Sequence, residues 1–115
     1  MTRLNANLLR GTLELLVLRA LVGGARHGYG ILEWLERAVA PALLVEEGTL
    51  YPALHRLEAD GWIRAEWGAS ENNRKAKYYR LTAEGKRRVA SESALFREYA
   101  DRVVRALAAE SEVTP

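Results

Sequence analysis

The sequence predicts a mostly helical α+β fold, in which three helices precede a two-stranded hairpin and one long helix closes the chain. Three observations lead to this expectation. Apolar residues recur at helical spacing through the first 60 residues. Two stretches of loosely alternating polarity then flank a segment rich in Gly, Ser and Asn, which is a turn signal. Finally, the residues from 83 to about 109 contain no helix breaker.

The first half of the chain predicts two helices. Residues 8–22 read LLRGTLELLVLRALV, a wide apolar stripe that Gly23-Gly24 stops, so this helix should be mostly buried. Residues 28–40 form the second helix, and Pro41 ends it because a proline disfavours helical geometry in the residue before it. Residues 43–45 are too short for their period to identify them. We expect a small strand there that pairs with the later hairpin.

The chain is organised around residues 48–63, which read GTLYPALHRLEADGWI. Leu50, Leu54 and Leu57 recur at i, i+4 and i+7 and form one apolar helical face. At about 100° per residue, the face opposite these leucines is polar and non-acidic. Its residues are Thr49, Tyr51, Pro52, His55 and Arg56.

The ends of this third helix are also readable. Thr49 is the expected N-cap, and Pro52 is tolerated because the first-turn N–H groups lack intrahelical acceptors. Asp60-Gly61 should end the helix, with Gly61 in the left-handed conformation. Tyr51 is open to two interpretations, a contact to a binding partner or a packing residue at the helix boundary. For Pro52, a helix-start role is favoured over a contact to a partner.

The two strands of the hairpin are expected at residues 62–67 (WIRAEW) and 77–81 (KYYRL), joined by a nine-residue polar loop. Trp62 and Trp67 are interpreted as strand core or as part of a dimer edge. A short helix with a polar, non-acidic outer face that leads directly into a basic hairpin is typical of a winged helix-turn-helix.

Thr82 should cap the last helix, which at 1.5 Å per residue would be roughly 40 Å long. Its apolar residues fall close to heptad spacing, with charged residues between them. They are Val89, Phe96, Tyr99, Val103, Ala106 and Leu107. A small core leaves such a helix little of its own chain to pack on, so a second copy is the favoured partner. The alternative is packing along the first helix of the same chain.

These elements divide the chain into three parts. Residues 1–81 form the expected winged helix DNA-binding domain, residues 82–110 the C-terminal dimerisation helix, and residues 111–115 a disordered tail.

Charge is unevenly distributed along the chain. The formal net charge is +2, but residues 27–66 carry three Arg against seven acids, whereas residues 73–88 carry seven Lys and Arg against one acid. A local concentration of positive charge matters more to a polyanion than the total does. A solvated face is the alternative interpretation of such a run.

Composition and motifs exclude several classes of protein. The sequence has no Cys, no apolar run of 18 residues and no recognisable signal peptide, so we expect a cytoplasmic protein without a membrane span. His27 and His55 are the only histidines, and neither has metal-binding spacing. No serine has a base paired with it, and Gly28-Tyr29-Gly30 lacks the context of a phosphate loop. We therefore expect neither an enzyme nor a cofactor.

Three segments carry a family resemblance: GYGI (28–31), GTLYPALHRLEADGWI (48–63) and RKAKYYRLTAEGKR (74–87). In their order and spacing they closely resemble the PadR family of bacterial transcriptional regulators, over about residues 8–108. The single C-terminal helix is similar to the compact subgroup of that family.

The resemblance implies a homodimeric winged helix-turn-helix repressor that binds a palindromic operator in double-stranded DNA. The recognition helix would be residues 49–60, and Tyr29 would contact a phosphate. The DNA-binding residues implied by position are Tyr29, Thr49, Tyr51, Pro52, His55, Arg56, Arg74, Lys75 and Lys77. His55 stands where family members often have Lys or Arg, and it is a weaker cation at neutral pH.

The resemblance also implies a small-molecule effector, because compact members can hold planar hydrophobic compounds between their subunits. The interface and ligand residues would be Val89, Phe96, Tyr99, Val103 and Leu107. Trp62 or Trp67 would approach them from the hairpin. The alternative is a closed dimer core in which these rings pack only on one another. A different function for the whole chain, a winged helix used only for protein contacts, also stays open.

Overall fold

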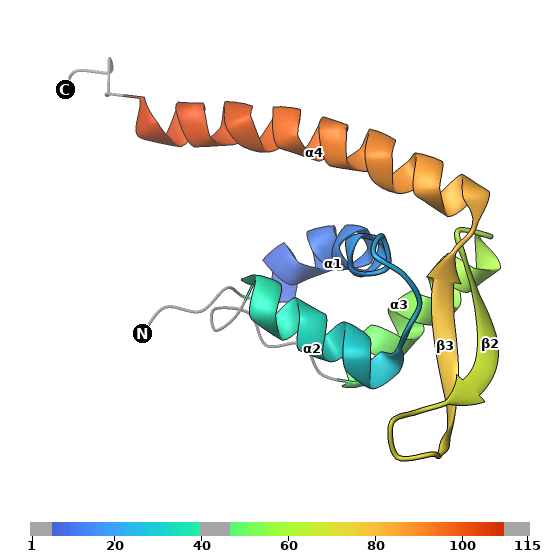
Figure 1. Cartoon of the computed structure of the whole chain (residues 1–115). Helices are drawn as coiled ribbons and strands as arrows, with labels where there is room; N and C mark the ends of the chain where they lie inside the picture. The colour runs from blue at the N-terminus through green and yellow to red at the C-terminus, as the bar shows by residue number, and fades with distance from the viewer. Residues whose placement is uncertain (1–5, 40–46, 110–115) are drawn as a thin grey trace.

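The computed structural model describes residues 6–39 and 47–109, which form four helices and a small antiparallel sheet (Figure 1). This arrangement confirms the predicted α+β winged helix fold with a long C-terminal helix. The elements are α1 (Ala6–Ala20), β1 (Arg26–His27), α2 (Gly28–Val39), α3 (Glu47–Ala59), β2 (Ile63–Ala69), β3 (Lys75–Leu81) and α4 (Ala83–Ala108).

The core lies where α1, α2, α3 and the sheet meet. Leu50, Leu54 and Leu57 of α3 are fully buried there, as the i, i+4, i+7 spacing predicted. Val17 of α1 and Ile31 of α2 are buried against them in the same cluster. The apolar face of α3 packs against α1, α2 and β2. Its opposite face is exposed to solvent.

The third strand of the sheet is β1, immediately before α2. The strand order is β1-β3-β2, and Arg26 pairs with Tyr79 in antiparallel register. Residues 43–45, where a strand was expected, lie outside the described residues. A strand of two residues has no readable period, so only its tertiary pairing identifies β1.

The wing is a longer hairpin with a shorter loop than predicted. Its strands pair from Ile63↔Leu81 to Ala69↔Lys75, which leaves residues 70–74 as the loop. The Ser70 N–H donates to the Arg74 carbonyl at 2.7 Å, and Asn73 has the positive φ of 63° that such a tight turn requires. Residues 68–69 and 75–76, which were expected in the loop, pair in the sheet instead. The prediction of a nine-residue loop is therefore wrong.

The two ends of α3 differ in how well they were predicted. The helix begins at Glu47, so Thr49 lies within its first turn and the prediction of Thr49 as N-cap is wrong. At the other end, Gly61 has φ 83°, and the Trp62 N–H donates to the Leu57 carbonyl at 3.0 Å. This pattern is a Schellman motif, which confirms the expected glycine stop.

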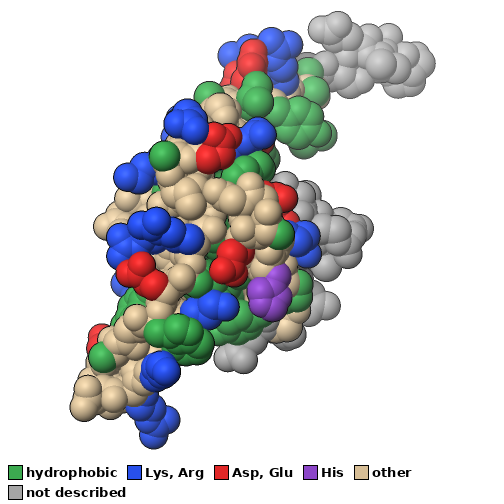
Figure 2. All heavy atoms as spheres, turned by 90° about the vertical axis from the view of Figure 1, so that its right-hand side faces the viewer, with side chains coloured by type: hydrophobic (Ala, Val, Ile, Leu, Met, Phe, Trp, Pro, Cys, Tyr) green, Lys and Arg blue, Asp and Glu red, His purple; other side chains and the backbone are tan. Residues whose placement is uncertain are grey.

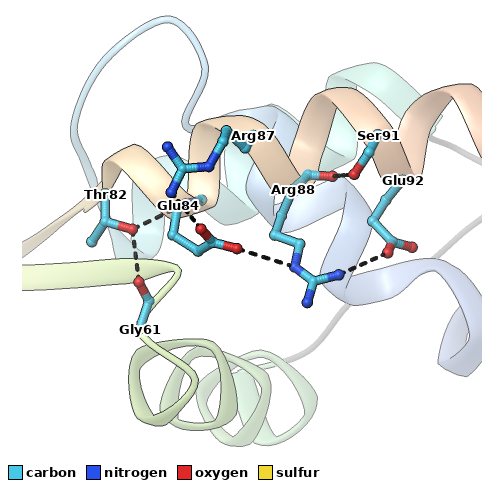
Figure 3. Close-up of polar contacts among 8 residues, drawn as sticks. Gly61, Thr82, Glu84, Arg87, Arg88, Ser91 and Glu92 are labelled. Atoms are coloured by element: carbon cyan, nitrogen blue, oxygen red, sulfur yellow. Dashed lines mark hydrogen bonds and ion pairs between the residues drawn. The ribbon is translucent and has the colours of Figure 1, made fainter.

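The start of α4 is joined tightly to this turn (Figure 3). The Thr82 hydroxyl accepts from the Gly85 N–H at 3.0 Å, which confirms the predicted N-cap, and it donates to the Gly61 carbonyl at 2.7 Å. The Thr82 N–H also donates to the Trp62 carbonyl at 3.0 Å. The backbone of α4 passes so close that a Cβ on Gly85 would overlap that same carbonyl oxygen. We call Gly61, Trp62, Thr82 and Gly85 the α3–α4 junction.

Beyond the junction, α4 leaves the body of the molecule (Figure 1). Its first turns pack on the core, and Val89 is only 7% exposed. The prediction of Val89 as an interface residue is therefore wrong, because this side chain is already buried within its own chain. Farther along, Phe96, Tyr99 and Leu107 are exposed and Val103 is half-buried. The alternative prediction, that α4 packs along α1 of the same chain, is correct for part of α4 only, because α4 contacts α1 but its distal apolar side chains stay exposed.

The junction gives a stability prediction. Gly85→Ala should lower the free energy of unfolding by about 1–3 kcal/mol or more, because the new methyl group meets backbone that cannot rotate away. Urea denaturation followed by circular dichroism measures the effect. Gly48→Ala is the matched control: nothing lies within 4 Å of its added Cβ, so it should be neutral or stabilising by up to about 1 kcal/mol. Equal stability of Gly85→Ala and the native chain would contradict the close approach.

Candidate nucleic-acid interface

The exposed side of α3 is directed away from the core. Placed at about 100° per residue from the buried leucines, Gly48, Pro52, His55 and Ala59 lie on the opposite face, and all four are exposed. None of them carries a negative charge. This face is free to enter a groove, because the elements that hold α3 pack on its other side.

The flank of α3 that faces the sheet carries Tyr51 and Glu58. Burial raises the pKa of the Tyr79 hydroxyl, and Tyr51 and Glu58 add to the effect through their charges. Tyr79 lies on β3, so these two side chains of α3 approach the sheet. The helix α3 is thus set against the wing along this flank.

A cleft of about 710 Å³ opens between the wing and the helices. It brings together five of the predicted DNA-binding residues from α2, α3 and the wing: Tyr29, Tyr51, Arg74, Lys75 and Lys77. Two acids, Glu33 and Glu71, also line it. Four other predicted residues do not line this cleft, although all of them are exposed on the same helix: Thr49, Pro52, His55 and Arg56.

Tyr51 has a packing role that the sequence left open. Its side chain is 38% exposed, and its hydroxyl lies where a Cβ on Gly28 would be. The start of α2 can approach α3 this closely only because residue 28 is a glycine. The packing interpretation of Tyr51 is therefore the one that the contacts favour, and the ring also forms part of the wall of the cleft.

Tyr29 stands at the first turn of α2 and is 64% exposed, as a phosphate contact requires. The residue that orders this turn is His27, whose Nδ1 accepts from the Gly30 N–H at 3.0 Å. The His27 ring also contacts Tyr78 on the wing, with 5.2 Å between centroids. His27 could not be predicted as a helix cap, because histidine is not among the usual capping residues.

Arg56 lies on the other flank of α3, away from the wing. Its Nε donates to the Glu14 carboxylate of α1 at 2.5 Å, and both side chains remain partly exposed. A surface ion pair of this kind contributes little to stability, but it holds the guanidinium toward α1. Arg56 is therefore not grouped with the residues of the wing cleft. The sequence could not reveal this pairing, which joins residues 42 positions apart.

Basic and aromatic side chains alternate along the wing. Lys75 Nζ lies 5.4 Å from the centre of the Trp67 ring, and Lys77 Nζ lies 5.7 Å from that of Tyr79. Trp67 is 63% exposed, so its assignment to the strand core is wrong; the dimer-edge alternative stays a prediction. Trp62, in contrast, is half-buried and packs against the core.

Figure 2 shows how charge is spread over this side of the molecule, with Lys and Arg side chains at the tip of the wing and along the long helix. Acidic side chains stand among them. Some of the cations are already paired, as Arg80 is with Glu66 at 3.2 Å. Within the described part of the chain, three wing cations form no ion pair: Arg74, Lys75 and Lys77. Their charge is therefore available to an anionic partner.

A second hollow, of about 520 Å³, lies between α1 and α4. Phe96 and Tyr99 line it together with Trp62, which confirms that Trp62 approaches this region. Val103 and Leu107 do not line it, since they lie farther out on α4. Its other walls are Glu14, Leu15, Leu18, Glu92 and Leu95. We call this hollow the α1–α4 groove.

The fold and this arrangement of groups define a winged helix transcription factor. Over residues 17–91 the chain matches the family described as the Transcriptional regulator PadR-like family. The chain belongs to this family. It is a DNA-binding transcriptional regulator, and neither the family nor its structural relatives are enzymes. Within residues 6–39 and 47–109, no helix is long and apolar enough to cross a membrane.

Individual relatives agree with this assignment. An uncharacterised protein of Lysinibacillus sphaericus is 33% identical over 96 residues, covering 84% of this chain and 85% of its own length. A PadR family regulator from Eggerthella lenta is 34% identical, with a TM-score of 0.75 and coverage of 90% of this chain and 88% of its own. A PadR-like regulator from Bacillus cereus has a TM-score of 0.81 at 26% identity, covering 91% of this chain and 100% of its own.

The contact between Gly28 and Tyr51 can be tested by a double-mutant cycle. Gly28→Ala should destabilise the native chain by about 1–3 kcal/mol, because its methyl group meets the Tyr51 hydroxyl. In a Tyr51→Phe background the same substitution should cost less, since the overlapping oxygen is gone. Urea denaturation of the four proteins gives the coupling energy. An identical cost in both backgrounds would show that the Tyr51 hydroxyl does not restrict the space at Gly28.

Proposed function

We propose that this protein is a repressor that acts in the cytoplasm and binds a palindromic operator as a homodimer. The observation that carries the proposal is the combination of an exposed, non-acidic outer face on α3 with the cations Arg74, Lys75 and Lys77 at its flank. Each protomer would place α3 in the major groove and the wing against the neighbouring backbone or minor groove.

The dimensions of α3 suit this role. Its 13 residues span about 20 Å at 1.5 Å per residue, and a helix of this kind fits the major groove, where base edges can be read. Thr49, Pro52 and His55 would face the bases, with Tyr51 beside them. Arg56 is held toward α1 by Glu14, so it would reach DNA only by leaving that ion pair.

Phosphate contacts would come from the two sides of the wing cleft. Arg74, Lys75 and Lys77 would supply them from the wing, and the exposed Tyr29 hydroxyl from the start of α2. Such contacts provide much of the affinity for DNA and make it depend on salt, without reading the sequence themselves.

The dimer would form through residues 82–110, with residues 1–81 as the DNA-binding part. Phe96, Tyr99 and Leu107 support it, because they leave an apolar stripe exposed on a helix that extends past its own core. Val103 continues that stripe. A two-fold axis between two copies of α4 would relate two recognition helices, and a two-fold dimer reads an inverted repeat.

The α1–α4 groove is the place where a planar hydrophobic effector would relieve repression. Phe96, Tyr99 and Trp62 offer aromatic surface there, and offset or edge contacts suit a flat apolar molecule. Quenching of Trp62 fluorescence would report its occupancy. A dimer whose rings pack only on one another would leave the fluorescence unchanged by any such compound.

The DNA-binding role leads to a prediction about salt. Replacing Arg74 and Lys75 with Ala should weaken binding to operator and random duplexes alike and reduce the salt slope by about one or two units, as two phosphate contacts are lost. Fluorescence anisotropy over a series of salt concentrations measures both quantities. A chain used only for protein contacts would show no salt-dependent DNA binding at all.

The control for charge is the pair Arg97→Ala and Arg102→Ala, which removes the same charge from α4 at exposed positions away from the wing cleft. This variant should keep the native salt slope to within about half a unit. If both double variants lower the slope equally, the effect comes from net charge and the wing makes no phosphate contacts.

The dimer is tested by placing charge on its proposed seam. Phe96→Asp with Val103→Asp should give monomers in sedimentation analysis, because two carboxylates would be buried without partners. Ala90→Asp with Ala94→Asp adds the same charge on the opposite, exposed side of α4 and should leave the dimer intact. An unchanged dimer in the first variant would place the interface elsewhere.

A further inference from the structure

Trp67 is a large aromatic side chain that is not buried in the core of the fold. It lies in β2 between Glu66 and Gly68 and is 63% exposed, and it does not belong to the hydrophobic core cluster of the described residues. A single exposed apolar residue is not unusual by itself. What distinguishes Trp67 is the face on which it lies and the groups beside it.

The register of the sheet fixes that face. Trp67 pairs directly with Lys77, Ala65 with Tyr79 and Ile63 with Leu81, and opposed residues in an antiparallel pair project from the same side. Ile63, Tyr79 and Leu81 are buried in the core. Trp67 therefore lies on the side of the wing that faces the helices, past the point where the core covers it.

Two cations accompany the indole on this side. Lys75 Nζ lies 5.4 Å from its ring centre, which is cation–π distance, and Lys77 stands directly opposite on β3 and lines the wing cleft. A flat apolar ring with one cation over it and a second cation on the opposite strand suits a partner that alternates anionic and apolar groups. The deoxyribose–phosphate backbone has this character, with an apolar sugar face between phosphates.

We infer that Trp67 is a DNA contact: its ring packs on a deoxyribose at the edge of the minor groove next to the segment that α3 reads, while Lys75 and Lys77 pair with the flanking phosphates. The inference rests on the proposed function and adds to it an apolar contact from the wing. Since every nucleotide carries the same sugar, this contact strengthens binding without selecting a sequence.

The first test compares Trp67→Ala, Trp67→Phe and Lys75→Ala in anisotropy titrations with operator and random duplexes. Trp67→Ala should weaken both complexes about tenfold, which is the range of a single aromatic stacking contact, without changing the salt slope. Trp67→Phe should recover part of that loss. Lys75→Ala should instead lower the slope by about one unit. Trp67 is exposed, so Trp67→Ala should fold as the native chain does, which circular dichroism verifies.

The second test follows the indole itself. The fluorescence of the native chain minus that of Trp67→Phe isolates Trp67 from Trp34 and Trp62, and this difference signal should be quenched and shielded from acrylamide when DNA binds.

Native affinity in Trp67→Ala, or a difference signal that DNA leaves unchanged, would overturn the inference while the proposed function stands. Loss of the dimer in Trp67→Ala would also overturn it, in favour of a dimer edge. If the native chain binds no DNA, the proposed function fails first, and this inference fails with it.

Discussion

The close approach of two backbone segments at the α3–α4 junction is the constraint on which the rest of the molecule depends. The Trp62 carbonyl oxygen accepts from the Thr82 N–H and lies against Gly85, where a Cβ has no room. The Thr82 hydroxyl adds a second link by donating a hydrogen bond to the Gly61 carbonyl. The end of α3 and the beginning of α4 are thus held together by backbone contacts, which leave less freedom than side-chain packing would.

Side chains reinforce this junction from outside. The Arg88 guanidinium lies 4.7 Å from the centre of the Trp62 ring and pairs with Glu84 at 3.5 Å and Glu92 at 3.6 Å (Figure 3). A hydrogen bond from Arg87 lowers the pKa of Glu84, so the carboxylate stays charged near the positive end of the helix dipole. The ion pairs lie within α4 and are partly exposed, so they contribute little, and the junction depends mainly on its backbone geometry; among these contacts, only that between Arg88 and the Trp62 ring joins α4 to the junction.

Local signals predicted the elements well and their contacts poorly. The leucine spacing of α3, its glycine stop and the Thr82 cap are encoded within a few residues, and the structure confirms each of them. The strand β1 was missed because two residues have no period.

The candidate site shows the same division. The family resemblance named Tyr29 and the wing cations as DNA-binding candidates, and only the structure shows that they line one cleft. Gly28 beneath Tyr51 and Glu14 beside Arg56 are pairs that no local pattern records. The strand-core interpretation of Trp67 failed for a different reason: its alternating position predicted burial, but this part of the strand extends beyond the core.

Trp62 belongs both to the α3–α4 junction and to the α1–α4 groove, where the effector is proposed to bind. Its carbonyl belongs to the junction that holds α3 to α4, and its ring lines the α1–α4 groove beside Phe96. In the proposed dimer, the angle between α4 and the body sets the separation of the two recognition helices. A molecule in the groove can change operator affinity only if it binds one such separation better than another. Because the junction resists bending at Gly85, the freedom for that change would have to lie farther along α4, where Val103 and Leu107 would meet the second copy of the proposed dimer.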